Sequence, residues 1–172
     1  MSGICPALTG GTSSTEEPRP TSAFSKLLPN GAAVVEATPS MWRGGLYPAE
    51  EAHIARAVPS RAREFTAGRN CARKALQKIG VEPTAIPAGP DRAPQFPPTV
   101  AASITHTKGY CAAVAMLRGR VQSIGIDAEL AAPLERELIW LILTEEERAG
   151  FSEVTVGYDL PKLAFCAKEA YY

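Results

Sequence analysis

The chain has 172 residues, of which 45% are apolar and 21% charged, a composition that suits one compact unit or two small packed halves. Eighteen basic and eighteen acidic residues give a formal net charge of zero, which argues against a nucleic-acid protein that works through a bulk positive field. The sequence has neither an apolar run of the roughly 20 residues that span a bilayer nor the layout of a secretory signal, so we predict a soluble, cytoplasmic protein with no membrane or nucleic-acid partner.

The four cysteines are widely and irregularly spaced, and the chain has only two histidines. This pattern matches neither a zinc site nor a disulfide framework. We therefore expect reduced thiols, most of them packed inside the protein.

The first half of the chain predicts an arm, a strand, two helices and a loop. Residues 1–22 are rich in Gly, Ser, Thr and Pro and have almost nothing apolar to bury, so we expect a mobile arm outside the fold. After the arm we expect a strand over 32–37, a helix over 48–58, a long helix over 61–79 and a stiff, proline-rich loop over 82–98. Ser60 is the expected N-cap of the long helix, and Gly80 is expected to end it.

The second half of the chain begins with a β pattern and continues with helices. We expect strands over 100–105 and 110–117, joined by a hairpin turn, and a third strand over 122–128. Helices are expected over 133–143, after Thr144, and from Pro161 to Tyr172. Thr144 and Glu147 have the spacing of a capping box.

Two carboxylates, Asp127 and Glu129, alternate along the expected third strand. Alternation places both on one face, where like charges are unfavourable unless a cation lies between them. A hard cation with oxygen ligands, such as Mg²⁺, is the simplest candidate. The alternative is a strand end at which two acids are merely hydrated, and the residues alone leave both interpretations open.

The basic residues of the long helix lie on different sides of it. At about 100° per residue, the buried stripe is defined by Phe65, Ala72, Leu76 and Ile79. Arg61 projects into this stripe and Arg69 lies at its border, where an arginine needs a carboxylate or phosphate partner unless its side chain extends to water. The other basic residues fall toward the opposite side as ordinary solvated charges: Arg63, Arg73, Lys74 and Lys78.

Further polar residues gather at the hairpin and on the last helix. Ser103 and Thr105 share one strand face, and His106 follows at the turn as either a phosphate-binding imidazole or a hydrogen-bonded turn histidine. Nothing nearby suggests the Ser-His-Asp arrangement of a hydrolase. Lys168 and Glu169 taken alone indicate a charged helix surface, but a Mg²⁺ site that uses substrate phosphates would need such a third acid and a neighbouring cation.

Five segments of the chain, in this order, carry a family resemblance. They are RAREFTAGRNCAR at 61–73, APQFP at 93–97, SITH at 103–106, GIDAE at 125–129 and FCAKEA at 165–170. Together they resemble the 4′-phosphopantetheinyl transferase superfamily, specifically the branch of the enterobactin synthetase D component and its actinobacterial relatives. The match covers about residues 31–172, and the ordered set is far more specific than any one segment.

The resemblance implies a two-lobed α+β fold with pseudo-twofold symmetry, in which coenzyme A and Mg²⁺ bind between the lobes. The division would fall near Gly119, between an N-terminal α+β lobe of residues 23–118 and a partial C-terminal lobe of residues 119–172. The implied reaction transfers the 4′-phosphopantetheine arm of coenzyme A to a serine of an apo acyl or peptidyl carrier protein and releases 3′,5′-ADP. A monomer is expected because both lobes lie on one chain, and the pathway served is left open among siderophore, polyketide and fatty-acid synthesis.

The resemblance also assigns roles to individual residues. Asp127, Glu129 and Glu169 would hold Mg²⁺, with Glu169 the expected base and with Asp127 and Lys168 completing the catalytic set. Arg61, Arg69 and His106 would neutralise coenzyme A phosphates, and Lys168 would lie near the pyrophosphate. The expected additional contacts with the nucleotide are Ser103, Thr105 and Arg92.

The chain departs from the family pattern at its end. The family normally carries a second phosphate-contacting lysine three residues after the alanine of the last segment, and this chain stops at Tyr172, one residue before it. As a complete protein the chain is expected to be catalytically impaired, whereas as part of a longer one it is expected to be active. Two alternatives stay open: a coenzyme A or nucleotide-binding protein without turnover, and a structural or partner-binding α+β domain.

Overall fold

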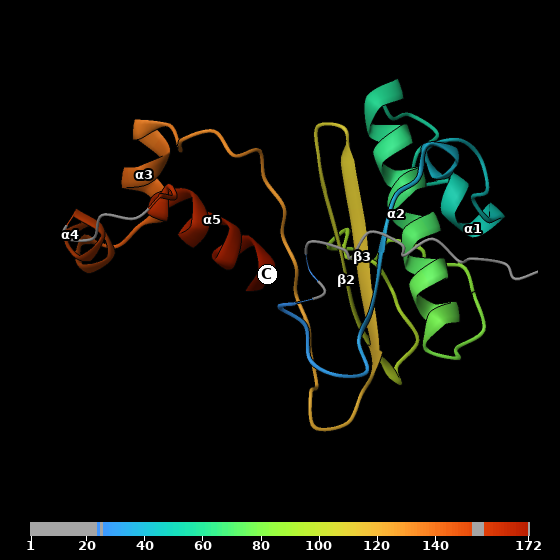
Figure 1. Ribbon diagram of the computed structural model, residues 1–172. Helices are drawn as coiled ribbons and strands as arrows, with labels where there is room; N and C mark the ends of the chain where they lie inside the picture. The colour runs from blue at the N-terminus through green and yellow to red at the C-terminus, as the bar shows by residue number, and fades with distance from the viewer. Residues whose placement is uncertain (1–23, 25, 153–156, 172) are drawn as a thin grey trace, which may run out of the picture.

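The computed structural model describes residues 24, 26–152 and 157–171, so the predicted arm over 1–22 lies outside the described residues. Within them the elements are β1 (Ala33–Glu36), the 3₁₀ helix η1 (Pro39–Trp42), α1 (Pro48–Glu51), α2 (Pro59–Lys78), β2 (Val100–Thr107), β3 (Tyr110–Leu117), α3 (Arg136–Ile142), α4 (Glu145–Ser152) and α5 (Leu160–Tyr171). One antiparallel sheet with separate helices makes this an α+β fold, as predicted (Figure 1).

The sheet has three antiparallel strands in the order β1-β3-β2, so β3 lies in the centre. β2 and β3 form the predicted hairpin, and Gly109 in its tight turn has a φ of 77°, which glycine adopts without steric cost. The residues of β3 with no exposed surface are Ala112, Ala113, Val114 and Ala115. Since neighbours along a strand point to opposite faces, the central strand is covered on both sides.

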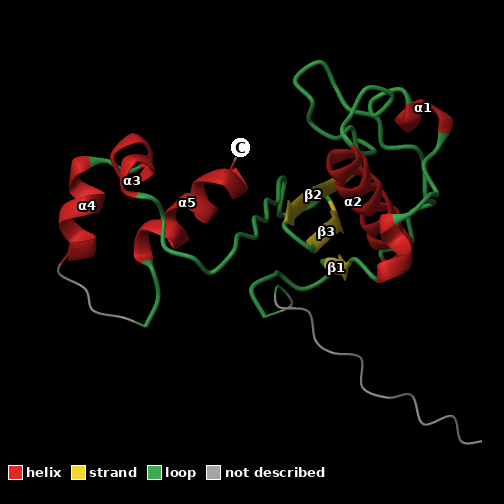
Figure 2. Ribbon diagram, turned by 90° about the horizontal axis from the view of Figure 1, so that it is seen from above, coloured by secondary structure: helices red, strands yellow, loops and turns green. Residues whose placement is uncertain are grey.

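The long helix α2 covers one face of the sheet (Figure 2). Small residues of the helix, Cys71, Ala72 and Ala75, pack with Ala113 and Ala115 of β3 in the main core. The approach is so close that a Cβ placed on Gly68 would lie 2.9 Å from Ile104 Cγ2 of β2. Small side chains on both surfaces therefore set the distance between the helix and the sheet.

The predicted third strand over 122–128 is wrong. These residues form no strand and instead cross the face of the sheet opposite α2, where Ile124 and Ile126 pack against Ala112 and Val114. The Ile126 N–H donates to the Ser103 hydroxyl at 3.2 Å. The apolar alternation thus reflects burial on a sheet face, and side-chain hydroxyls take the place of a strand ladder.

Two predictions about the N-terminal helices also need correction. The helix expected over 48–58 exists only as the four-residue α1, because His53 and Ile54 donate to carbonyls three residues back and the chain continues in turns. Ser60 is not the N-cap of α2: the helix begins at Pro59 with Val58 in the cap position. Proline suits that first position because it has no N–H to leave unpaired.

The helices after the sheet include the predicted capping box. The Thr144 N–H donates to Glu147 Oε2 at 2.8 Å, and the Glu147 N–H donates to Thr144 Oγ1 at 3.2 Å. Lys168 Nζ of α5 donates to the same Glu147 oxygen at 2.7 Å, and this bond, ahead of the Thr144 N–H, holds the pKa of Glu147 below its ordinary value. The preceding helix, α3, begins at Arg136 instead of Pro133. In the part of the chain that is described, no helix combines the length and apolarity needed to cross a bilayer.

We predict that Gly68→Ala destabilises the protein by about 1–3 kcal/mol, because the added methyl group forces α2 away from Ile104. In an open helix the same change is stabilising by about 1 kcal/mol. Urea unfolding measures the difference. Gly150→Ala in α4 is the matched control, since nothing lies within 4 Å of a Cβ at that position. A Gly68→Ala variant as stable as the parent would contradict the close packing of α2.

Candidate functional site

A cavity of about 950 Å³ lies along the outer edge of β2, which no other described strand covers. Its walls come from residues 91–94, from β2, and from residues 123–129 together with the end of α5. Seven residues predicted for the site line it: Arg92, Ser103, Thr105, His106, Asp127, Glu129 and Glu169. The cavity therefore joins predicted residues from separate segments of the chain.

Thr105 anchors Asp127 on the sheet. Its buried hydroxyl donates to Asp127 Oδ1 at 3.1 Å and accepts the Ala128 N–H at 2.9 Å. The other carboxylate oxygen, Asp127 Oδ2, is buried and has no hydrogen-bond partner among the described residues. A buried acceptor without a donor is costly, and a cation or a ligand donor at this oxygen would remove the cost.

Glu169 reaches the cavity because α5 approaches Gly125 closely. A Cβ at Gly125 would overlap the Ala170 carbonyl, so only glycine allows this contact. Three carboxylates, from Asp127, Glu129 and Glu169, then line one cavity. Among the described residues, no three His, Cys, Asp or Glu side chains lie close enough together to hold a metal ion as they stand. Carboxylate oxygens are the ligands that Mg²⁺ prefers.

Cys166 of α5 lies beside the same carboxylates. Burial first, then Asp127 and more weakly Glu129, raise the pKa of its thiol to about 11. The thiol therefore stays protonated at neutral pH and does not act as a thiolate.

His106 lies on β2, paired with Cys111, and its ring faces the first turns of α2. Arg61 Nη1 donates to His106 Nε2 at 2.6 Å, while His106 Nδ1 lies 3.7 Å from Glu64 Oε2. Because an arginine can only donate, this contact places the ring proton of a neutral His106 on Nδ1. Of the two alternatives for Arg61, the structure shows the side chain that extends to water: it is 54% exposed at the start of α2.

Arg69 is a buried cation with one polar contact. Its Nε donates to the Ile86 carbonyl at 2.6 Å, and its guanidinium lies 4.1 Å from the centre of the Phe65 ring. Burial is the largest cause that lowers the pKa of Arg69 to about 10, so it remains charged at neutral pH. It forms no ion pair with a described carboxylate, which leaves its two Nη groups suited to an anion.

Lys168 and Arg92 differ in their availability. Lys168 Nζ donates to the Ile142 carbonyl at 2.8 Å and to Glu147, so it is engaged among the last three helices and is not a lining residue of the cavity. Arg92 is exposed at the cavity with a φ of 69°, and its guanidinium has no partner among the described residues.

Residues 49–116 match the family model described as the 4′-phosphopantetheinyl transferase N-terminal domain. The chain is 42% identical over 126 residues to the 4′-phosphopantetheinyl transferase Npt of Nocardia iowensis, covering 73% of this chain and 57% of that protein. It is 37% identical to Svp of Streptomyces mobaraensis, covering 74% and 53%, and 39% identical to PptT of Mycobacterium tuberculosis, covering 73% and 56%; both bear the same enzyme name. The chain belongs to the 4′-phosphopantetheinyl transferase family.

The chain spans a little over half the length of the relatives it matches. The matched domain includes α2 and β2 and ends within β3, so it contains Arg61, Arg69, Arg92 and His106. Asp127, Glu129 and Glu169 follow it in the sequence. The cavity thus combines residues of the matched domain with residues that lie after it.

The sequence interpretation missed a buried ion pair. Arg73, predicted to be solvated, is only 7% exposed and donates from Nη1 to both carboxylate oxygens of Glu50 at 2.7 and 2.6 Å. A single buried stripe does not describe α2, because the helix is covered by the sheet on one side and by the segments around Gly45 and Ile86 on another. The run of small residues Ala67, Gly68, Cys71 and Ala72 was the available signal for this wider burial.

We predict that Thr105→Val lowers the free energy of unfolding by about 1–3 kcal/mol, because Asp127 Oδ1 loses its donor and the Ala128 N–H loses its acceptor. The change keeps the side-chain shape, so packing is preserved. Urea unfolding measures the loss, and hydrogen exchange should become faster at the Ala128 amide. Thr105→Ser retains the hydroxyl and is the control. Equal stability of the valine variant would show that Thr105 does not anchor Asp127.

Proposed function

We propose that the protein transfers the 4′-phosphopantetheine group of coenzyme A to a serine of an apo acyl or peptidyl carrier protein, with Mg²⁺, and releases 3′,5′-ADP. The cavity along β2 carries this proposal: Asp127 Oδ2 has no hydrogen-bond partner among the described residues, and the cationic side chain of Arg92 and the His106 ring line the same cavity. That combination fits a phosphate ester together with a divalent cation. The family membership of the chain points to the same chemistry.

The acidic wall would hold the cation. Asp127, Glu129 and Glu169 are the proposed ligands, and the buried, unpartnered Asp127 oxygen supports the choice because a cation would satisfy it. Mg²⁺, when bound, supplies charge neutralisation at the pyrophosphate oxygens of coenzyme A. Thr105 holds the Asp127 carboxylate in place through its hydroxyl.

The basic residues would bind the phosphates. His106 lines the cavity and contacts Arg61 of α2, and Arg92 is exposed on the wall formed by residues 91–94. Arg69 does not line the cavity; the Ile86 carbonyl holds its Nε, and its Nη groups form no ion pair with described residues. The arginines would stabilise negative charge on the leaving 3′,5′-ADP. Lys168, now bonded to Glu147, would have to leave that carboxylate to reach the pyrophosphate.

Glu169 is the proposed base for the serine hydroxyl of the carrier protein. It lies at the exposed side of the cavity, on the last turns of α5, where a second protein can approach it. Its carboxylate, directly or through a water molecule, would accept the hydroxyl proton as the oxygen attacks the β-phosphorus of coenzyme A. The identity of the carrier protein, its pathway and the monomeric state stay predictions.

The first test is intact mass spectrometry of an apo carrier protein after incubation with this chain, coenzyme A and Mg²⁺. We expect a mass gain of one phosphopantetheine group that disappears when EDTA is added. Coenzyme A binding without any mass gain would instead support a binding protein without turnover. Absence of both binding and mass gain would overturn the proposed function.

We predict that Asp127→Asn lowers the transfer rate by about a hundredfold or more, since a neutral amide cannot neutralise a divalent cation. Initial rates at saturating coenzyme A measure the effect, and raising the Mg²⁺ concentration should partly restore them. Glu137→Gln, which removes an exposed carboxylate of α3 outside the cavity, is the charge-matched control. An Asp127→Asn variant with the parent's rate and Mg²⁺ dependence would exclude Asp127 as a ligand.

A further inference from the structure

Glu50 is a fully buried carboxylate that joins three segments of the chain. Its oxygens accept both hydrogen bonds from Arg73 Nη1 of α2, at 2.7 and 2.6 Å. Glu50 Oε2 also accepts the Tyr47 N–H at 2.9 Å, and Oε1 accepts the Ile86 N–H at 2.8 Å. The carboxylate therefore connects its own helix, α2 and the proline-rich loop.

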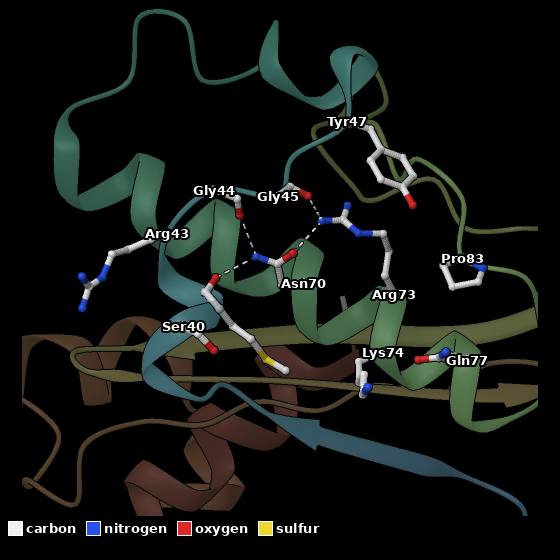
Figure 3. A pocket seen from close by; sticks show the side chains of 11 residues that line it. Ser40, Arg43, Gly44, Gly45, Tyr47, Asn70, Arg73, Lys74, Gln77 and Pro83 are labelled. Carbon is white, nitrogen blue, oxygen red and sulfur yellow. Dashed lines mark hydrogen bonds between the residues drawn. The ribbon is translucent and has the colours of Figure 1, made fainter.

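The opposite side of Arg73 is equally well bonded (Figure 3). Arg73 Nη2 donates to the Gly45 carbonyl and, at 2.7 Å, to Asn70 Oδ1. Asn70 Nδ2 in turn donates to the Met41 carbonyl at 2.8 Å and the Gly44 carbonyl at 3.1 Å. The guanidinium is thus fixed by charge and by hydrogen bonds, which is the condition under which a buried ion pair is tolerated.

The same network reaches the proposed phosphate-binding residues. Ile86 is held at both ends of its backbone: its N–H donates to Glu50, and its carbonyl accepts Arg69 Nε at 2.6 Å. Two residues later the Ala88 N–H donates to His53 Nε2 at 3.2 Å. Ala88 pairs with Pro94 in an isolated bridge, and Arg92 lies in the turn between them.

Resting on the proposed function, we propose that the buried Glu50–Arg73 pair positions Arg69 and Arg92 for the phosphates of coenzyme A. The pair fixes Ile86, and Ile86 fixes the Nε side of Arg69, so the Nη side, which bonds to no described residue, is the part available to a ligand. Glu50 also acts on Arg69 through charge, since its field opposes the lowering of the Arg69 pKa by burial. Glu50 and Arg73 are positioning residues, because neither lines the cavity.

Two features distinguish this role from a purely structural one. An ion pair that only joined α1 to α2 would have no need of the Ile86 N–H, yet that amide shares Glu50 Oε1 with Arg73. In addition, the charge of Arg73 is compensated by Glu50, whereas the equally buried Arg69 receives, from the described residues, only a carbonyl and a ring face. Arg73 therefore serves as a structural support, whereas Arg69 keeps N–H donors that bond to no described residue.

The test replaces the charged pair without leaving a charge unpaired. The double variant Glu50→Leu/Arg73→Met keeps a packed interior, and substitution of buried pairs by apolar residues often preserves folding. We expect its affinity for coenzyme A to fall by about tenfold or more, the value of one lost charge-assisted contact. Tyr110→Phe, which removes a partly buried hydrogen bond to Glu36 on β1, is the control for general loss of stability and should bind normally.

A double-mutant cycle separates positioning from destabilisation. In an Arg69→Met background, the double variant should cost little further affinity, because the residue that it positions is already gone. Independent, additive losses would overturn the proposal. As a second variant, Arg73→Lys keeps the positive charge without the planar fork and should bind with intermediate affinity.

Titration with pyrophosphate as well as coenzyme A distinguishes the two proposals. Unchanged affinity of the double variant for both ligands would overturn the positioning role while the proposed function stands. Pyrophosphate binding that depends on the pair, with no coenzyme A binding by the parent chain, would support the positioning role and overturn the proposed function. Binding of neither ligand by the parent chain would overturn both.

Discussion

The close contact of α2 with the sheet is the constraint on which the rest of the structure depends. Small residues on both surfaces, among them Gly68, Ala72 and Ala113, bring the helix near enough for its side chains to reach β2 directly. His106 can therefore meet both Arg61 and Glu64 from the helix. Larger side chains in this interface would move the helix away from β2 and separate the basic residues from the strand that carries the histidine.

The opposite face of the sheet supplies the acidic part of the site. Ser103 and Thr105 point to this face and bind the backbone of the crossing segment through their hydroxyls, so the segment lies on the sheet instead of at its edge. This leaves the outer side of β2 free of any described strand and open to a cavity. The same hydroxyl of Thr105 holds Asp127 with one oxygen bonded and the other unsatisfied. That unsatisfied oxygen is the observation on which the proposed cation site rests.

Two buried arginines, four residues apart on α2, differ in how their charge is compensated. Arg73 has a carboxylate, an amide and a carbonyl around it, and its desolvation is offset inside the protein. Arg69 has no carboxylate bonded to it in the described part of the chain, and burial lowers its pKa to about 10. Burying a cation without a carboxylate partner is unfavourable, which is the basis for proposing an anionic ligand at Arg69.

The residue pattern by itself determined the α+β class, the long helix, the hairpin, the capping box at Thr144, and the family, because periodicity, turn residues and ordered motifs are properties of neighbouring residues. Only the tertiary structure decided that residues 122–128 cross a sheet face, that Arg73 is buried against Glu50, and that Arg61 stays exposed. Two of these outcomes depend on hydrogen-bond partners 23 residues away in the sequence: Ser103 for Ile126 and Glu50 for Arg73. A helical wheel or a strand alternation places a side chain relative to its own element, but burial and charge compensation are settled by whatever packs against that element from elsewhere in the chain.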